Sequence, residues 1–345
     1  MIMRWRPYLT IAALVLLTQG TAAPAHGAPT FPEARPTPAP SSPEATDTAS
    51  LAALTAQIQA FARDLERTRR FMGAPKVRVL DIGIRDPSLR DLYFHTLTLE
   101  EKTGRLLFEV KGAHEIPPVP PPNDISLQVI LGKLRDTHQT LRQVMQDLNI
   151  APAEEPLPET SRSFTQLFSD VLEANRQLNQ LLERHISPSD VYQELTLAIG
   201  YSARLLARYP DATRIPSEPP FEPDKQPKDV YRRLTECLQI ISRIFDSLGL
   251  AALHVDPSRT DLDSLQPSDV YLIAAMIVSQ LDFLYRYLDI AKSPPQPVYP
   301  GLKFPAHSYQ RAGILQDQLR QLERFLATDR ATTTLPARPQ EQEAP

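Results

Sequence analysis

The sequence predicts an all-α protein with about eight helices, arranged as a helical-repeat bundle or a short solenoid with long proline-rich connections. Three observations support this prediction. A short phrase, Pro-Ser-Asp-Val-Tyr or a variant of it, recurs ahead of stretches of about twenty residues with helical apolar spacing. The 345 residues include 35 prolines and only 11 glycines, which favours sharp helix boundaries and stiff connections. Only residues 77–84 and 253–255 resemble strands, too few for a sheet of consequence.

The recurring phrase begins at Pro188, Pro227 and Pro267, with a looser copy at Pro305. Weaker copies are found earlier in the chain. The positions that correspond to the Asp of the phrase are 91, 124, 163, 190, 229, 269 and 307. The usual spacing is near 39 residues, which accommodates one helix of about 22 residues and a connection of about 16.

The geometry of the first helical turn explains why these residues recur in the phrase. Proline suits the first turn of a helix because its missing N–H has no partner there and its φ angle is already helical. Ser187 can cap the helix, and Asp190 then lies three residues later, beside free N–H groups and the positive end of the helix dipole. We therefore interpret Asp190, Asp229 and Asp269 as capping carboxylates rather than catalytic acids.

Three connections are rich in proline: residues 116–122, 215–227 and 294–305. Twelve residues in the polyproline conformation reach roughly 37 Å, and a helix of about 22 residues is about 33 Å long. Such connections can return along a whole helix, so neighbouring helices can run parallel. In contrast, the short loop at Ile186 and Ser187 predicts that the helices on its two sides, one ending at His185, are antiparallel neighbours.

The N-terminal 27 residues have the layout of a secretory signal peptide. Arg4 and Arg6 precede an apolar run at 8–17, and small residues follow at 20–28. The apolar run is shorter than the roughly 20 residues that span a bilayer. Cleavage after Ala22 and cleavage after Gly27 are both compatible with this pattern, and an uncleaved interfacial anchor is the alternative. We expect a periplasmic or secreted protein with no transmembrane segment after signal removal.

The remaining chain divides by composition into three segments. Residues 28–49 are rich in Pro, Ala, Ser and Thr and predict a disordered linker, and residues 331–345 predict a disordered tail. Between them, residues 50–330 predict the helical repeat domain. Its first helix is expected at 51–71, where apolar residues recur at helical spacing.

Charge and cysteine content exclude several classes of protein. The chain has 37 basic and 41 acidic residues, and removal of the signal leaves 35 against 41, a net charge of −6. This argues against nucleic acid as a partner and gives no reason to expect an anionic membrane surface. Cys237 is the only cysteine, so no disulfide can form within one molecule. It lies in the apolar stripe of a predicted helix, which indicates a buried structural thiol.

Residues that could carry catalysis or hold a metal or cofactor are dispersed. No two histidines beyond the signal lie within four residues of one another; they are His95, His114, His138, His185, His254 and His307. The sequence has no Gly-rich phosphate loop, nucleophile elbow or haem attachment pair. We therefore expect no metal site, no cofactor and no enzymatic activity. An enzyme assembled from distant residues is the least favoured reading.

The recurring tyrosines are the candidate binding residues: Tyr93, Tyr192, Tyr231, Tyr271 and Tyr309. They could line one end of the body beside the proline-rich loops, or each could pack over the first turn of a neighbouring helix. The favoured function is a non-enzymatic scaffold or protein-interaction protein of the bacterial periplasm, whose partner is another envelope or secreted protein. The alternative is a carrier or sensor that holds a small apolar ligand within the bundle.

Overall fold

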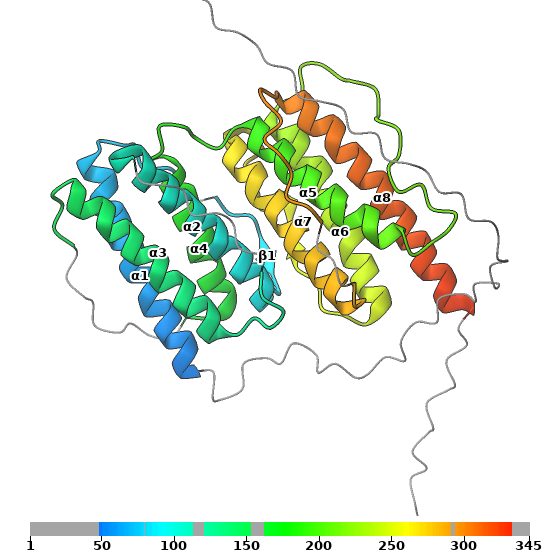
Figure 1. Ribbon diagram of the computed structural model, residues 1–345, viewed down its shortest axis with the longest axis horizontal. Coiled ribbons are helices and arrows are strands. Elements are labelled where there is room, and N and C mark those ends of the chain that lie inside the picture. Colours follow the sequence, from blue (N-terminus) through cyan, green and yellow to red (C-terminus); the bar gives the residue numbers. More distant parts are fainter. Residues whose placement is uncertain (1–47, 79, 113–120, 153–161, 291–293, 333–345) are drawn as a thin grey trace, which may run out of the picture. The chain divides into compact units, whose positions relative to one another are not determined.

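The protein is described by a computed structural model over residues 48–78, 80–112, 121–152, 162–290 and 294–332 (Figure 1). The predicted signal peptide, nearly all of the predicted linker and nearly all of the predicted tail lie outside these ranges. The described chain contains eight α-helices: α1 Thr48–Phe71, α2 Leu89–Lys111, α3 Leu127–Asp147, α4 Phe164–Asn179, α5 Pro188–Leu206, α6 Pro227–Leu248, α7 Pro267–Tyr287 and α8 Pro305–Thr332. The all-α prediction is confirmed.

Two very short strands are the only β-structure in the described ranges. β1 (Ile84–Arg85) and β2 (His254–Val255) pair antiparallel, with Ile84 opposite Val255. Each strand lies within or at the end of one of the two segments that the sequence marks as strand-like. They join two connections by backbone hydrogen bonds and do not form a layer of the fold.

Capping carboxylates begin the helices that carry the recurring phrase. Asp190 accepts the Ser187 N–H at 2.8 Å, and Asp269 accepts the Gln266 N–H at 2.8 Å. Asp229 does the same for its own N-cap residue. Asp91 closes an equivalent capping box at the start of α2. These aspartates satisfy backbone donors at helix starts, as the sequence predicts.

The weaker copies of the phrase differ from this pattern. The copy that contains Asp124 does not begin a helix: α3 is capped instead by Ser126, whose hydroxyl accepts the Val129 N–H at 3.3 Å. The prediction that a helix begins at the Asp124 copy is therefore wrong, because Ser126, two residues later, provides the cap. In α4, Gln166 takes the place of the aspartate. In α8, His307 Nδ1 accepts the Phe304 N–H at 3.1 Å.

The helices pack in two groups of four with the same order of neighbours (Figure 1). In the first quartet, α1 and α2 each contact α3 and α4. In the second quartet, α5 and α6 each contact α7 and α8. Consecutive helices within the pairs α1–α2, α3–α4, α5–α6 and α7–α8 therefore stand on opposite corners of their quartet.

All four helices of the second quartet run in the same direction. Ser308 Oγ donates to the Pro188 carbonyl near the start of α8 and α5, and Gln318 Nε2 approaches the Ile199 carbonyl further along both helices. The side-chain contacts between α6 and α8 also join early residues of one helix to early residues of the other, and late residues to late residues. Contacts between α5 and α7 follow the same order, so these pairs are parallel as well. Each connection must therefore return along the length of a helix.

The first quartet has the same parallel arrangement. Lys133 pairs with Glu100 at 2.7 Å, and Lys111 pairs with Asp147 at 3.4 Å, so α2 and α3 run together. Contacts of α1 with α3 and of α2 with α4 follow the same order. An up-down bundle would give the opposite order of contacts.

Antiparallel packing of the helices on either side of Ile186 is not found in the described chain. α4 ends at Asn179 rather than at His185, so residues 180–187 separate it from α5. α4 packs on α1, α2 and α7, whereas α5 packs on α7 and α8. The longer connection allows α5 to join the other quartet, and the prediction that these helices are neighbours is wrong.

α7 is the central helix of the fold. It contacts α5 and α6 within its own quartet and α2 and α4 of the first quartet. Among the described helices, it alone is long and apolar enough to cross a bilayer, and 89% of its most apolar window is buried within the protein. Burial of this kind is typical of a core helix.

Candidate interaction face

The connection between α5 and α6 lies along α8. The Thr213 N–H donates to Gln321 Oε1 at 3.0 Å, and the Pro219 carbonyl accepts from Gln310 Nε2 at 2.7 Å. Thr213 is thus near the end of α8 and Pro219 is near its start. Segment 213–221 therefore runs antiparallel to α8. Its backbone is held in place by glutamine side chains rather than by a sheet or helix.

The connection between α7 and α8 lies along α5 in a similar way. The Pro297 carbonyl accepts from Gln193 Nε2 at 2.9 Å, and the Lys303 N–H donates to Ser189 Oγ at 2.9 Å. Segment 294–304 therefore runs antiparallel to α5. Both segments are extended chains fixed on helices that are neighbours of one another.

Two glycines allow the segments to approach the helices. A Cβ atom built on Gly313 would lie 2.7 Å from Pro219 Cγ, closer than real side chains come. A Cβ atom on Gly200 would lie 3.1 Å from Pro294 Cβ. These helical glycines thus provide room for a proline of each segment, a reason for glycine that concerns packing and not backbone conformation.

Exposed hydrophobic side chains concentrate on these two segments. Of the ten large hydrophobic residues that are exposed in the described chain, six form what we call the apolar loop face: Ile215, Phe221, Val298, Tyr299, Leu302 and Phe304. Val298 and Leu302 are 89% and 78% exposed. Exposed apolar residues are common singly, so their concentration on two segments makes these segments the candidate interaction face.

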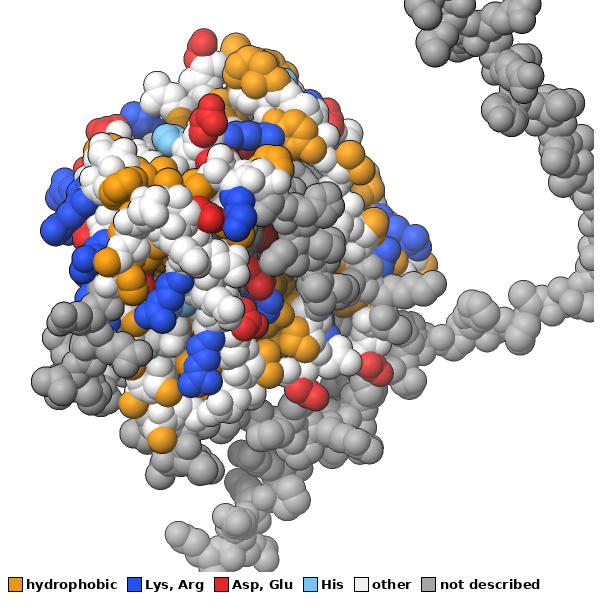
Figure 2. Space-filling model, turned by 60° about the vertical axis from the view of Figure 1, so that its left-hand side comes forward, with side chains coloured by type: hydrophobic (Ala, Val, Ile, Leu, Met, Phe, Trp, Pro, Cys, Tyr) orange, Lys and Arg blue, Asp and Glu red, His pale blue; other side chains and the backbone are white. Residues whose placement is uncertain are grey.

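The two segments meet at the start of α8. The ring centroid of His307 lies 5.1 Å from that of Phe221 and 5.8 Å from that of Phe304. His307 thus bridges the aromatic residues of the two segments while its Nδ1 atom caps α8. The face drawn in Figure 2 carries groups of hydrophobic side chains with Lys, Arg, Asp and Glu side chains between them.

Basic side chains border the apolar loop face. Lys303 and Arg311 approach the Tyr192 ring from 5.0 and 5.1 Å, and Arg184 lies 4.8 Å from the centroid of Tyr299. Cation–π contacts of this type hold both partners in place. Arg311 Nη1 also lies 3.8 Å from Oε1 of Glu218, a residue of segment 213–221. The face therefore combines aromatic and aliphatic groups with an edge that carries both signs of charge.

The structure does not gather the five candidate tyrosines at one site. Tyr192 lies at the edge of the apolar loop face, and Tyr309 lies on α8 beneath Arg233, whose guanidinium carbon is 3.5 Å from the ring centroid. Tyr271 donates to Glu194 at 3.5 Å. Tyr93 and Tyr231 are buried. Tyr192 thus lies where it can contribute to this face directly.

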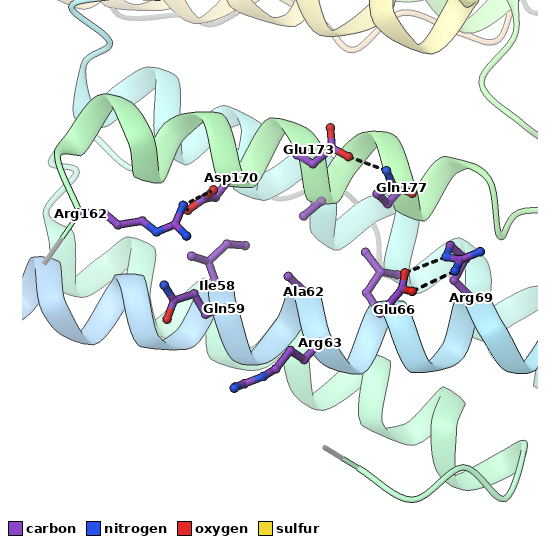
Figure 3. A pocket seen from close by; sticks show the side chains of 12 residues that line it. Ile58, Gln59, Ala62, Arg63, Glu66, Arg69, Arg162, Asp170, Glu173 and Gln177 are labelled. Atoms are coloured by element: carbon purple, nitrogen blue, oxygen red, sulfur yellow. Dashed lines mark hydrogen bonds and ion pairs between the residues drawn. The ribbon is translucent and has the colours of Figure 1, made fainter. Parts of the chain in front are cut away.

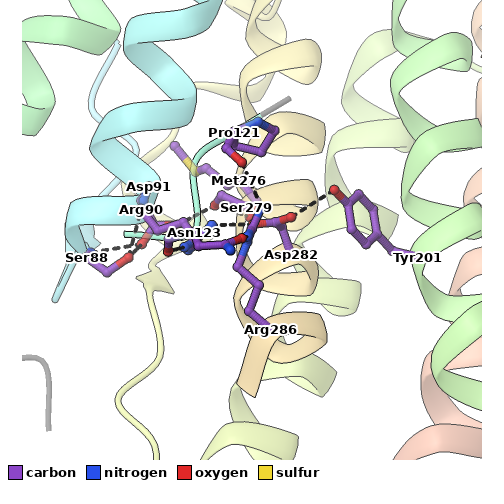
Figure 4. Close-up of polar contacts among 10 residues, drawn as sticks. All are labelled: Ser88, Arg90, Asp91, Pro121, Asn123, Tyr201, Met276, Ser279, Asp282 and Arg286. Atoms are coloured by element: carbon purple, nitrogen blue, oxygen red, sulfur yellow. Dashed lines mark hydrogen bonds and ion pairs between the residues drawn. The ribbon is translucent and has the colours of Figure 1, made fainter. Parts of the chain in front are cut away.

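A buried polar junction joins the two quartets (Figure 4). Asp282 of α7 accepts from Arg90 of α2, from Arg286 Nε at 2.9 Å and from Tyr201 Oη at 2.9 Å. Burial beside this carboxylate raises the pKa of Tyr201. The Asp282 side chain is buried. We interpret it as a structural contact, because a buried charge requires such partners.

A second buried polar group lies where α2 and α4 meet the start of α7. Arg176 Nε pairs with Asp269 at 2.8 Å, and Lys102 Nζ donates to the Asn175 carbonyl at 3.1 Å. Burial lowers the pKa of Lys102 to about 7. Burial, and then the charge of Lys102, lower the pKa of His95 to about 3. Both His95 nitrogens lack a hydrogen-bond partner within the described chain.

Sequence reasoning missed this buried polar group, although a signal was present. Apolar residues of α2 recur at Leu92, Leu99 and Leu106, and His95 and Lys102 occupy the same stripe. Polar residues in an apolar stripe indicate a buried contact with another element. The histidines otherwise remain apart, and the described residues contain no group of three His, Cys, Asp or Glu side chains that could hold a metal ion.

Comparisons with protein-family models, curated proteins and solved structures give no significant match to this chain.

Proposed function

We propose that this protein is an exported, non-enzymatic helical scaffold of the bacterial periplasm, which binds another envelope or secreted protein through the apolar loop face. The observation that carries the proposal is the concentration of exposed hydrophobic residues on two extended segments. Export rests on the N-terminal signal pattern in residues 1–27.

Fixed segments suit protein recognition because little conformational freedom remains to be lost on binding. Gln310 and Gln321 hold segment 213–221, and Gln193 and Ser189 hold segment 294–304. Prolines restrict both segments further. The apolar loop face is thus preorganised to receive a partner surface.

The chemistry of the face indicates the chemistry of its partner. Val298, Leu302 and Phe304 offer apolar contacts, and the edge carries Lys303 and the Arg311–Glu218 ion pair. We expect a protein surface with apolar side chains at its centre and charged side chains of both signs at its rim, since complementary charge orients association. In this proposal the eight helices are repeat units, and the repeat builds the scaffold rather than the binding site.

Site-specific photocrosslinking tests the proposal. A photoreactive phenylalanine analogue at Leu302 or Val298, in the full chain exported by its own cell, should yield one discrete crosslinked protein. Matched probes at Phe71 and Phe108 test exposed apolar positions of the first quartet that lie outside the face. The control probes should not yield the same species.

A single substitution in the apolar loop face should be enough to abolish the crosslink. Leu302→Glu, examined with the probe at Val298, should abolish the crosslinked species while the helical content of the protein stays the same. If the same species forms equally from Phe71, or if no position of the face yields one, the proposal is wrong.

A further inference from the structure

Two pockets of the first quartet differ in the charge of their linings. One, of about 340 Å³, lies between α1 and α4 (Figure 3). Its lining has three carboxylates and three arginines, and Figure 3 shows Glu66 paired with Arg69 and Asp170 paired with Arg162. Arg63 leaves α1 on the side away from α4 in that view. The charges of this pocket largely cancel, so its lining favours no charged ligand.

The second pocket, of about 550 Å³, lies where three parallel helices end. It is lined by residues of segment 72–75, which follows α1, by the last turns of α2 and by residues of segment 180–185, which follows α4. Its volume is within the range of about 300–1,000 Å³ that small-molecule sites occupy. We call it the helix-end pocket.

Most of the lining of the helix-end pocket is apolar. Seven of its eleven residues have apolar side chains. Leu106, Leu181 and Leu182 are buried, whereas Met72 is 39% exposed. The pocket therefore has an apolar wall and is open to solvent at Met72, where a ligand can enter.

The carboxylates of this lining have no cationic partner. Glu109 Oε2 accepts the Glu183 N–H at 2.8 Å and its Oε1 accepts the Arg184 N–H at 3.2 Å, which fastens the chain after α4 to α2. Within the described ranges, neither Glu109 nor Glu183 forms an ion pair, and no Lys or Arg lines the pocket. The lining therefore carries unbalanced negative charge.

Basic side chains close to the pocket are engaged by other groups. Arg69 donates to the carbonyl of a lining residue, but its guanidinium is paired with Glu66 at 2.7 Å. Lys111, at the end of α2, pairs with Asp147 at 3.4 Å. The guanidinium of Arg184 lies 4.8 Å from the centroid of an aromatic ring of the apolar loop face. These cations therefore leave the two carboxylates of the pocket unneutralised.

The helix ends add to the negative potential of the pocket. The last carbonyl groups of a helix lack partners within the helix, and they lie at the negative end of the helix dipole. Because α1, α2 and α4 run in the same direction, three such ends lie around the helix-end pocket. Cations are favoured at this position.

We propose that the helix-end pocket binds a small amphipathic cation, with its ammonium group beside Glu109 and Glu183 and its apolar chain against Leu106, Leu181 and Leu182. The site lies in the first quartet and shares no residue with the apolar loop face. It gives this protein a ligand-binding activity that is independent of the proposed scaffold function.

Calorimetric titration of the mature protein with octylamine at pH 7 tests the proposal. Octylamine should bind, whereas octanol and octanoate, which have an alkyl chain of the same length or nearly so, should bind at least about tenfold more weakly. Equal binding of octylamine and octanoate would show non-specific apolar association and would overturn the proposal. Absence of octylamine binding to the folded protein would overturn it as well.

Two pairs of variants locate the site. Glu109→Gln removes the charge and keeps an oxygen for one backbone N–H, and it should weaken octylamine binding about fivefold or more. Asp136→Asn, at an exposed acid of α3 outside the pocket, should change it less than about twofold. Ala74→Phe should fill the pocket and abolish binding, whereas Ala52→Phe, at an exposed alanine of α1, should not.

The result for Ala74→Phe decides the matter even if Glu109→Gln disturbs the fold. Residue 74 follows α1, and its contact with Arg69 is made by its backbone carbonyl, which the substitution retains. Unchanged octylamine affinity in either variant, with native helical content, would overturn the proposal. Loss of crosslinking from Leu302 would not bear on it, so failure of the scaffold proposal and failure of this one are distinguishable.

Discussion

The α1/α4 and α5/α8 contacts occupy equivalent places in the two quartets but differ in how they are filled. Between α5 and α8, Ser308 and Arg311 donate across the contact, and segments 213–221 and 294–304 lie on the two helices. Between α1 and α4 there is an open pocket of about 340 Å³. The same order of helix neighbours thus gives a closed contact or an open one, depending on side-chain size and on the path of the connections.

The largest effect is expected at the junction on which both quartets depend. Asp282→Ala should destabilise the protein by about 3–5 kcal/mol, because Arg90 would remain buried without its carboxylate. Urea unfolding of the variant measures this loss. As a control, Asp263→Ala removes a carboxylate that is 85% exposed and pairs with Lys228, and it should cost far less. Equal costs for the two variants would show that the junction contributes no special stability.

Enlarging an alanine tests the difference in packing between the two quartets. Ala312 of α8 is completely buried in the closed quartet, so Ala312→Leu should destabilise the protein by about 1–3 kcal/mol. Ala174→Leu, which extends into the pocket, should cost clearly less. Thermal unfolding of both variants gives the comparison. A greater loss for Ala174→Leu would mean that the α1/α4 contact is closed in solution.

Buried titratable groups of the first quartet predict a dependence of stability on pH. Burial holds the folded-state pKa of His95 at about 3, below the roughly 6.5 of an unfolded histidine. As pH falls below about 6.5, the unfolded state binds a proton first, so stability decreases. Between pH 7 and pH 5 the loss from this group should be about 2 kcal/mol.

Replacement of the imidazole should flatten this dependence. His95→Leu should remove most of that loss, measured by denaturant unfolding at pH 7 and at pH 5. His138, whose pKa is also lowered mainly by burial, contributes a dependence of the same sign, and it remains in the variant. An unchanged pH dependence in His95→Leu would contradict the assignment.

The smallest effect on stability is expected at Gly313, which leaves room for Pro219 of segment 213–221. Gly313→Ala places a methyl group against Pro219 and should destabilise the protein by about 1 kcal/mol. Gly132→Ala, in α3 with open space around it, should instead stabilise the protein by about 0.5–1 kcal/mol. Opposite signs in the two unfolding curves are the expected outcome. Stabilisation by both would show that segment 213–221 does not need the space at Gly313.

Helix starts were predictable from sequence where local chemistry decides them. Pro188, Pro227 and Pro267 each begin a helix, and the aspartate two residues later closes the cap. The start of α3 was missed because Ser126 provides the cap instead of Asp124. In both cases the deciding interaction spans three residues, within the reach of sequence reasoning.

Helix partners and the candidate sites could not be predicted in the same way. Whether α4 packs on α5 depends on interactions with distant helices, and α7 contacts both. Ala62 and Ala174 line the same pocket although they are 112 positions apart in the chain, so no local pattern reveals the pocket. The proline content predicts extended connections. Which helices they lie on depends on hydrogen bonds from the side chains of Gln193, Gln310 and Gln321 to the backbone of the connections, and these partners are distant in sequence.

Hydrogen exchange of the mature protein, alone and bound to the protein crosslinked from Leu302, tests the central claim most directly. Backbone protection on binding should be confined to segments 213–221 and 294–304 and to the first turns of α8 and α5. Exchange along α1 and α4 should stay the same. Protection along α1 and α4, with none on the two segments, would contradict the assignment of the apolar loop face.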